Sequence, residues 1–153
     1  MGFLGGLFGR KPEAGKLVRQ TGHTHTVTSV ALSRDGKQVV TGSWDNTAIL
    51  WQAATGKILQ TFEGHTDYVT SVALSGDGKY VVTGSQDNTA ILWQAATGKR
   101  LQTFNGHAEY VTSVALSGDG KHIVTGSEDK TAKLWEAASG KILQTFKGNL
   151  PEA

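Results

Sequence analysis

The chain contains no cysteine, only two prolines and no long hydrophobic run among its 153 residues. Without cysteine it has no disulfide bond, no thiolate metal ligand and no thiol nucleophile. No apolar stretch approaches the roughly 20 residues of a membrane-spanning helix, so we expect no membrane partner. The net charge is only +2, which argues against a nucleic-acid partner.

The first residues of the chain do not read as a targeting signal. In the segment MGFLGGLFGRK the basic residues Arg10 and Lys11 follow the apolar stretch, whereas a secretory signal places them before it. We therefore expect residues 1–21 to form an N-terminal tail and the protein to be cytoplasmic. The alternative for this tail is a short amphipathic anchor that uses the apolar residues Phe3, Leu4, Leu7 and Phe8.

A 42-residue repeat is the strongest feature of the sequence. Glycine is followed by histidine at Gly22, Gly64 and Gly106, and Gly148 continues the same spacing. The first two units are identical at 35 of 42 positions, which indicates duplication with little later divergence. The repeat divides the chain into three units and a C-terminal tail, with the bounds 22–63, 64–105, 106–147 and 148–153.

Each unit consists of four short β-prone runs separated by turn residues. In the second unit the runs are YVTSVAL, YVVTG, AILWQ and RLQTF, and the turns are SGDGK, SQDNT and AATGK. Asp-Gly and Thr-Gly pairs supply the conformations that tight turns need, and no run has a helical period. The sequence therefore predicts an all-β fold in which each unit forms a four-stranded antiparallel sheet.

One segment exceeds what three such units need. The sequence GKLVRQTGH at 15–23 is similar to GKILQTFEGH at 56–65, so residues 16–21 have the sequence of an extra outer strand. However, GKILQTF at 140–146 already completes the third unit. We expect residues 16–21 to act as a linker or a cap, and not as a strand exchanged into another chain.

Several features resemble the WD40 β-propeller family: the 42-residue period, the Gly-His pair, the Asp-Gly turn, the Ser-x-Asp-x-Thr turn and the late tryptophan of each unit. One departure is that Gln52, Gln94 and Glu136 stand where the family's name-giving aspartate follows the tryptophan. The resemblance covers residues 22–147 and implies that each unit is one blade of a propeller. It also implies a module for protein–protein interaction and not an enzyme.

The resemblance further implies a hydrogen-bonded network of four side chains in each blade. Its members are the histidine of Gly-His, a hydroxyl of the second strand, the aspartate of the next turn and the tryptophan of the third strand. The three sets are His23, Thr41, Asp45 and Trp51; His65, Thr83, Asp87 and Trp93; and His107, Thr125, Asp129 and Trp135. A hydroxyl acceptor removes the cost of about 1–3 kcal/mol for burying an unpaired indole N–H group. We therefore expect three structural tetrads.

The same residue types occur in hydrolases, but their pattern here argues against catalysis. A hydrolase needs one such set in one cleft with an oxyanion hole, whereas this set recurs in every unit without a Gly-x-Ser-x-Gly motif. No metal-binding motif, phosphate-binding loop or dinucleotide fingerprint occurs either. We predict that the chain is not an enzyme and uses no cofactor or metal.

Three blades are too few for a propeller, which typically has four to eight. Both ends of an open arc expose the same apolar residues that internal blades bury against one another, such as Val69, Val72, Leu74, Ile91, Leu92 and Trp93. We predict a homo-oligomeric ring in which blade 3 of one chain packs head-to-tail on blade 1 of the next. A trimer of nine blades is favoured over a dimer of six, because inner strands crowd in the smaller ring. Completion of the ring by a different propeller chain is the alternative.

The three units differ mainly at positions that the resemblance places on the docking face of a propeller. These candidate binding residues are His25, Thr26, Trp44, Asp67, Tyr68, Gln86, Glu109, Tyr110 and Glu128. Aromatic residues supply much of the binding energy of protein interfaces, so we expect Trp44, Tyr68 and Tyr110 to contribute most to binding a protein or peptide ligand. One alternative is that these exposed positions have merely diverged. The other is an assembly-only structural unit, recently amplified or engineered, with no specific ligand.

Overall fold

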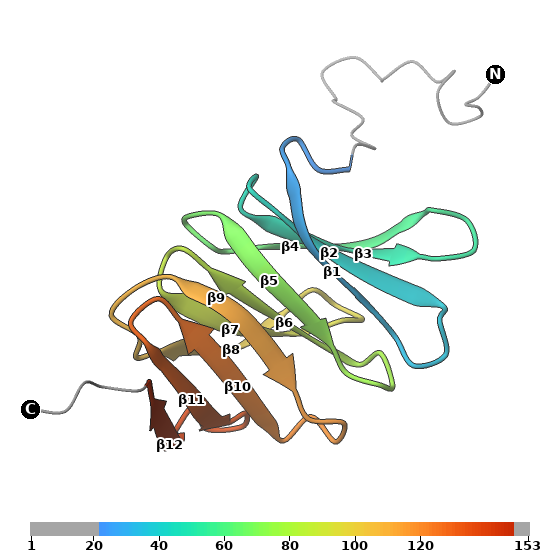
Figure 1. Ribbon diagram of the computed structural model, residues 1–153. Helices are drawn as coiled ribbons and strands as arrows, with labels where there is room; N and C mark the ends of the chain where they lie inside the picture. The colour runs from blue at the N-terminus through green and yellow to red at the C-terminus, as the bar shows by residue number, and fades with distance from the viewer. Residues whose placement is uncertain (1–21, 149–153) are drawn as a thin grey trace, which may run out of the picture.

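The computed structural model describes residues 22–148, which form three four-stranded sheets arranged side by side (Figure 1). Blade 1 consists of β1 (Val27–Leu32), β2 (Gln38–Ser43), β3 (Thr47–Gln52) and β4 (Ile58–Glu63). Blade 2 consists of β5 (Val69–Leu74), β6 (Tyr80–Ser85), β7 (Thr89–Gln94) and β8 (Arg100–Asn105). Blade 3 consists of β9 (Val111–Leu116), β10 (His122–Ser127), β11 (Thr131–Glu136) and β12 (Ile142–Lys147). The expected linker or cap at 16–21 lies outside the described residues.

Within each blade the chain runs up and down as a meander, which confirms the predicted all-β fold. Strands that follow one another in sequence are antiparallel neighbours in the sheet. In blade 2, for example, Thr83 of β6 pairs with Val72 of β5 on one side and with Ile91 of β7 on the other. The last strand, β12, pairs with β11, so blade 3 has its own outer strand.

The turns between strands show why their residues recur at fixed places. Gly78, between β5 and β6, has a φ of 76°, a conformation in which a side chain is strained. Asp77 holds the same turn, because its carboxylate accepts hydrogen bonds from the backbone N–H of Lys79 at 3.0 Å and from the Ser75 hydroxyl at 2.8 Å. These two bonds lower the pKa of Asp77 below its ordinary value. The turn sequence therefore fixes where β5 ends and β6 begins.

Neighbouring blades pack through the inner strand of one blade and the backbone of the blade before it. Val69 and Val72 of β5 are buried against β2, where Gly42 has no side chain. A Cβ atom at Gly42 would lie only 2.7 Å from a methyl carbon of Val69, so this close approach requires glycine. The same contact recurs between Gly84 and Val111 at the second junction, also at 2.7 Å.

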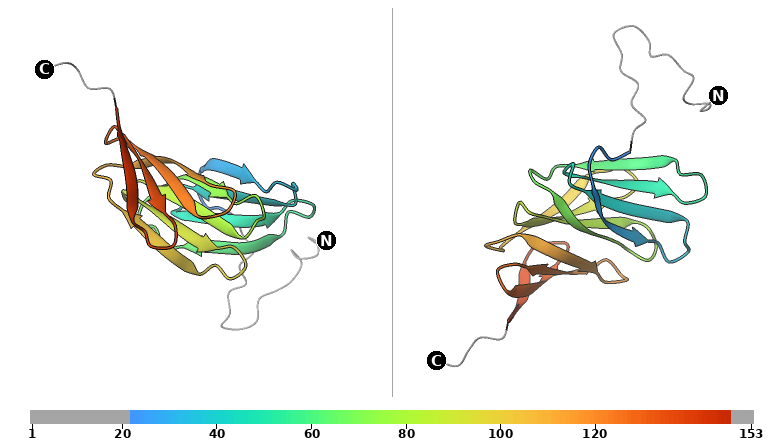
Figure 2. Two further views of the ribbon diagram at one scale, coloured as in Figure 1. Left: turned by 90° about the horizontal axis from the view of Figure 1, so that it is seen from below. Right: turned by 45° about the horizontal axis from the view of Figure 1, so that its top comes forward.

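Two further contacts cross the first junction. The Thr28 hydroxyl donates a hydrogen bond to the backbone carbonyl of Val69 at 2.6 Å. The ring of Phe62, on the outer strand β4, packs against Trp93 of blade 2 with the ring centroids 5.5 Å apart. Both rings are buried. The three blades thus form one stack with blade 2 between the other two (Figure 2).

Blade 1 exposes one half of such a junction. Val27, Val30 and Leu32 of β1 are exposed, because no blade precedes them among the described residues. Val30 is 66% exposed, whereas its equivalent Val72 in blade 2 is 7% exposed. The free face of β1 therefore has the apolar character of an internal junction.

Blade 3 exposes the other half. Val124 and Phe146 are exposed, although their equivalents in the first two blades are buried, namely Val40, Val82, Phe62 and Phe104. The expectation that both ends expose the same residues, tryptophan included, is wrong. Trp135 is only 1% exposed, because Phe104 of blade 2 covers it with the ring centroids 5.4 Å apart. The two ends are therefore complementary and not alike.

Candidate functional site

The histidine of each Gly-His pair lies in a loop that leads into the inner strand of a blade. His65 lies between β4 and β5, and its ring contacts two side chains of blade 2. The distance from Nδ1 to Asp87 Oδ2 is 2.8 Å, and the distance from Nε2 to Thr83 Oγ1 is 2.7 Å. The indole N–H of Trp93 donates to the same Thr83 oxygen at 2.9 Å. The structure thus brings together the four side chains expected in blade 2.

One arrangement of protons satisfies every group in this network. A neutral imidazole with its proton on Nδ1 donates to Asp87, and Nε2 accepts from the Thr83 hydroxyl. The oxygen of that hydroxyl accepts the indole N–H of Trp93. Because each buried polar atom has a partner, the network avoids the cost of burying an unpaired group.

Blades 1 and 3 repeat this geometry. The corresponding distances are 2.9 Å for His23–Asp45, 2.6 Å for His23–Thr41, 2.8 Å for Trp51–Thr41, 2.8 Å for His107–Asp129, 2.7 Å for His107–Thr125 and 2.9 Å for Trp135–Thr125. The same four residue types therefore build the same network in every blade, which is expected of a part that each blade needs for its own stability.

The network also contains groups that the sequence analysis did not assign to it. The Thr89 hydroxyl donates to Asp87 Oδ1 at 2.6 Å, and the backbone N–H of Thr66 donates to Asp87 Oδ2 at 3.1 Å. The signal for the hydroxyl is the threonine two residues after the aspartate in the Ser-x-Asp-x-Thr turn, which recurs as Thr47 and Thr131. The backbone donor leaves no signal in the sequence, because any residue can supply it.

These donors keep the aspartates ionised. Burial alone raises the pKa of Asp87, but the hydrogen bonds from His65, Thr89 and Thr66 outweigh it and hold that pKa well below its usual range. The pKa values of Asp45 and Asp129 are lowered in the same way. Each blade thus carries one negative charge next to its histidine at neutral pH.

The atoms of the network match those of a hydrolase triad, but a substrate has no access to them. Thr83 is 0% exposed, and its oxygen is occupied by both His65 and Trp93. A catalytic hydroxyl must instead reach the atom that it attacks. Within residues 22–148 no three side chains are grouped so that they could hold a metal ion, and no helix there has the length and hydrophobicity to cross a membrane. The network is best explained as a brace between an inter-blade loop and its sheet.

Comparison with known protein families agrees with this geometry. The family model described as "WD domain, G-beta repeat" matches residues 15–52, 56–94 and 98–136. The chain belongs to the WD40 family. The second and third matches begin with the outer strand of one blade and end in the third strand of the next. A WD40 repeat of the sequence therefore spans two blades, and the braced histidine lies at the connection.

Similar proteins match over about one repeat. The small ribosomal subunit protein RACK1y of Oryza sativa subsp. japonica is 49% identical over 47 residues, which are 30% of this chain and 14% of that protein. Ribosome assembly protein 4 of Saccharomyces cerevisiae is 44% identical over 46 residues, 30% of this chain and 9% of that protein. The small ribosomal subunit protein RACK1 of Drosophila melanogaster is 49% identical over 39 residues, 26% of this chain and 12% of that protein. The chain thus spans a small part of these relatives.

Part of the expected binding face gathers at the junction of blades 1 and 2. Trp44 of blade 1 and Tyr68 of blade 2 are stacked, with ring centroids 5.0 Å apart and 19° between the ring planes. His25 lies 5.5 Å from Trp44 and 6.4 Å from Tyr68, centroid to centroid. The backbone N–H of Trp44 donates a hydrogen bond to the backbone carbonyl of Thr26 at 2.9 Å, yet Trp44 remains 38% exposed. Four of the nine predicted residues therefore meet here.

The next junction keeps the tyrosine but replaces the tryptophan by glutamine. Gln86 stands in blade 2 where Trp44 stands in blade 1, and Tyr110 stands in blade 3 where Tyr68 stands in blade 2. Tyr110 is exposed and makes no aromatic contact with the other described residues. At the end of blade 3 the same position is Glu128. The side chain at this position thus changes from aromatic to amide to carboxylate along the arc.

The strands of all three blades end at two opposite faces. We call one of them the His-loop face, which consists of 22–26, 43–47, 64–68, 85–89, 106–110 and 127–131. We call the other the Lys-turn face, which consists of 33–37, 53–57, 75–79, 95–99, 117–121 and 137–141. All nine predicted binding residues lie on the His-loop face, and the three networks lie directly beneath it.

Charge is divided unevenly between these faces and the strand ends next to them. The His-loop side carries two lysines, Lys130 and Lys147, and seven carboxylates, Asp45, Glu63, Asp67, Asp87, Glu109, Glu128 and Asp129. The Lys-turn side carries four carboxylates, Asp35, Asp77, Asp119 and Glu136, and seven cations, Arg34, Lys37, Lys57, Lys79, Lys99, Lys121 and Lys141. Arg100 adds a third cation to the His-loop side, because its guanidinium donates to the carbonyl of Gly64 there, whereas Lys133 lies within β11 and counts with neither side. The small net charge of the chain therefore conceals one acidic and one basic face.

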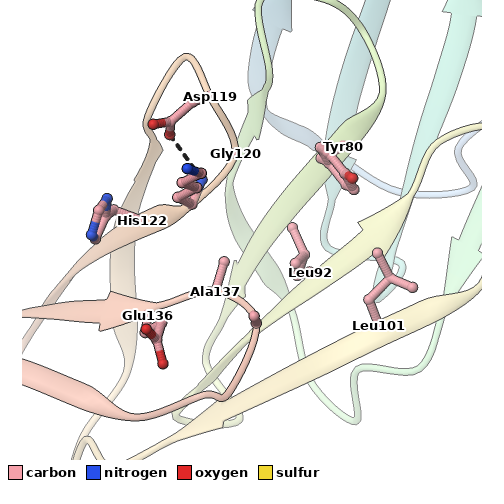
Figure 3. Close-up of a pocket in the computed structure, with 10 residues that line it drawn as sticks. Tyr80, Leu92, Leu101, Asp119, Gly120, His122, Glu136 and Ala137 are labelled. Carbon is pink, nitrogen blue, oxygen red and sulfur yellow. Dashed lines mark hydrogen bonds between the residues drawn. The ribbon is translucent and has the colours of Figure 1, made fainter.

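A groove of about 590 Å³ opens between blades 2 and 3 on the Lys-turn face (Figure 3). Blade 2 supplies Tyr80, Leu92 and Leu101, and blade 3 supplies His122 and Ala137 among others. A groove of about 700 Å³, lined by the equivalent positions, lies between blades 1 and 2. Because it recurs at both junctions, the groove is a general feature of blade stacking and not a site of its own.

The variant Asp87→Asn is expected to lower the free energy of unfolding by about 1–3 kcal/mol at pH 7, because it leaves donors of the network without a carboxylate acceptor. The pKa of Asp87 is lowered in the folded state, so its carboxylate stabilises the fold above the unfolded pKa of about 3.9 and loses that effect as pH falls. The difference between variant and native chain therefore shrinks at pH 3. Urea denaturation at pH 7 and pH 3 measures both effects.

The matched control is Asp67→Asn, on the same face but outside the networks. We expect it to change the free energy of unfolding by no more than about 0.5 kcal/mol. An equal loss of stability in the two variants would contradict the structural role of the network.

Proposed function

We propose that this WD40 chain is a non-catalytic module that closes into a ring with further copies of itself and presents its His-loop face to a protein or peptide ligand. The observation that carries the ring is the complementary exposure of the two ends of the arc. Blade 1 exposes the inner-strand half of a junction, and blade 3 exposes the half that receives such a strand. Apolar patches of this kind are rare on proteins that remain single.

The internal junctions provide a template for the contacts that a second copy would make. Gly84 of blade 2 receives the methyl groups of Val111 and Val114 from blade 3. Its equivalent in blade 3, Gly126, faces no valine of any described residue. Val30, the equivalent of Val114, is exposed on blade 1. A second copy of the chain therefore brings the required valine to Gly126.

Hydrogen bonding follows the same pattern. The hydroxyls of Thr28 and Thr70 each donate to a backbone carbonyl of the following blade, at 2.6 and 2.5 Å. Their equivalent, Thr112, donates only to the carbonyl of Gly126 in its own blade, at 3.3 Å. In the proposed ring Thr112 donates to the carbonyl of Val27 in the next copy.

A head-to-tail contact must either close by cyclic symmetry or continue as a filament. Two copies give a ring of six blades and three copies give a ring of nine. Six blades require about 60° per blade, which is within the range typical of propellers, and nine require about 40°, which is just outside it. We favour three copies, because the larger angle crowds the inner strands, which are already in close contact at Gly42 and Gly84.

The ligand-binding role is supported by the exposed aromatic residues of the His-loop face. A protein interface gains most of its binding energy from a few such side chains. The similar proteins are named as ribosomal subunit or ribosome assembly proteins, so they belong to a multi-component particle or its assembly. This supports a module that acts by binding other proteins.

A second candidate function is an assembly-only structural unit without a specific ligand. The identity of the first two units at 35 of 42 positions favours it, because recent duplication leaves little time for a binding face to become specialised. The two candidates share the ring and differ only in the role of the His-loop face.

The variant Val30→Glu tests the ring. Val30 is exposed in the single chain, so the variant should fold, but in the ring it places a carboxylate in an apolar junction. We expect its sedimentation coefficient to fall to that of one chain. Leu143→Glu is the control, because its equivalents Leu59 and Leu101 remain 40% and 39% exposed at the edge of a formed junction, against 42% for Leu143. Unchanged sedimentation of Val30→Glu, or an equal effect of the control, contradicts the ring.

Alanine substitution of Trp44, Tyr68 and Tyr110 together tests the binding face. We expect recovery of binding proteins from a cell lysate to fall at least about tenfold, because exposed aromatic residues anchor interfaces. Tyr80→Gln is the control: Tyr80 lies at the Lys-turn face, and glutamine already stands at its equivalent, Gln38. Undiminished recovery by the triple variant favours the assembly-only unit.

A further inference from the structure

We infer that the His-loop face takes a basic peptide segment, with an arginine or lysine side chain of the partner lying against the ring of Trp44. This inference rests on the proposed function, since it names the class of partner for the proposed interaction face. The stacked rings of Trp44 and Tyr68 provide the contact surface. The negative charge of the whole face favours a positively charged partner.

The aromatic cluster offers a surface that attracts a cation. Trp44 is stacked on Tyr68 and flanked by His25, yet more than a third of its surface is exposed. The face of an indole ring is electron-rich and is the best aromatic partner for guanidinium and ammonium groups. Among the described residues, the one cation placed over a tryptophan ring is Arg100 over Trp93, so no cation of this part of the chain occupies Trp44.

The charge around this cluster is an independent observation. The His-loop side carries seven carboxylates and three cations, Lys130, Lys147 and the guanidinium of Arg100. Three of the seven are the aspartates of the networks, which are held in place by hydrogen bonds from histidine, threonine and backbone groups. Of those that point outward, Glu109 and Glu128 form no ion pair with any lysine or arginine of residues 22–148. A basic segment is therefore attracted to this face and an acidic one is repelled.

The residues of the His-loop face differ from blade to blade, which favours one orientation of a bound peptide along the arc. The position of Trp44 becomes Gln86 in blade 2 and Glu128 in blade 3, and the position of His25 becomes Asp67 and then Glu109. The aromatic contact thus lies at one end of the arc, and Glu109 and Glu128 lie at the other. A peptide that binds across all three blades needs at least two basic side chains, one for the ring of Trp44 and one for the carboxylates of blade 3.

The repeat itself supplies variants that test this idea without disturbing the fold. Trp44→Gln and Glu128→Gln each introduce the residue that blade 2 carries at the same place, Gln86. Glu136→Gln is the matched control, because it also removes one carboxylate, lies at the Lys-turn face and introduces the residue found at Gln94. Each variant is checked for native stability by urea denaturation.

The probe is a fluorescein-labelled hexa-arginine peptide, compared with hexa-citrulline, which has the same shape without the charge. We expect the arginine peptide to bind the full-length chain at least about tenfold more tightly at low salt. Trp44→Gln weakens its binding about threefold to tenfold although no charge changes. Glu128→Gln weakens it about twofold to fivefold, and Glu136→Gln leaves it unchanged. The indole N–H signal of Trp44 is identified by its absence from the NMR spectrum of Trp44→Gln. In the native chain, we expect this signal to shift when the arginine peptide is added.

Equal binding of the citrulline peptide, an unaffected Trp44→Gln variant or an equal effect of Glu136→Gln would each overturn the inference. Association of rings into larger, salt-sensitive assemblies without peptide would also overturn it. In that case the acidic His-loop face would bind the basic Lys-turn face of another copy. If the peptide fails but the triple alanine variant still loses its binding proteins, the interaction face stands and only its preference for basic partners is wrong.

Discussion

The close approach of an inner strand to the backbone of the preceding blade is the contact on which the rest of this structure depends. It requires a glycine on one side, Gly42 or Gly84, and a pair of valines on the other. Because the contact buries apolar surface over the length of a strand, it holds three thin sheets together as one stack. It also explains why the arc has two unlike ends, since each end lacks one of the two partners.

The histidine networks address a different problem, which is how the chain passes from one blade to the next. A loop between two sheets has little core of its own, so a buried side chain must anchor it. His65 does this through Asp87 and Thr83, beneath the surface. Once the loop is anchored from below, its outer positions are free to vary. The stability of the blade and the chemistry of the His-loop face are thereby separated, which is why near-identical repeats present different side chains.

Much of the fold and of the networks could be predicted from the sequence, because the same pattern of residues occurs three times. The repeat length and the strand runs recur in register, so the all-β blades followed from residue type and spacing, whereas the twelve network residues followed from the resemblance to WD40 propellers. Contacts that join different repeats could not be read in this way. The stack of Trp44 on Tyr68 depends on how two blades are set against each other, and local periodicity carries no such information. The same holds for Phe104, which covers Trp135 and makes the ends complementary.

The central claim is that the open junction halves of one chain are filled by other copies of the same chain. The molar mass of the protein in solution, measured by light scattering over a range of concentrations, tests it most directly. One chain has a mass of 16.2 kDa. We expect a single species of three times that mass, which is the trimer with nine blades. A species of twice that mass would be the dimer with six blades, which also closes a ring. A monodisperse species with the mass of one chain would contradict it.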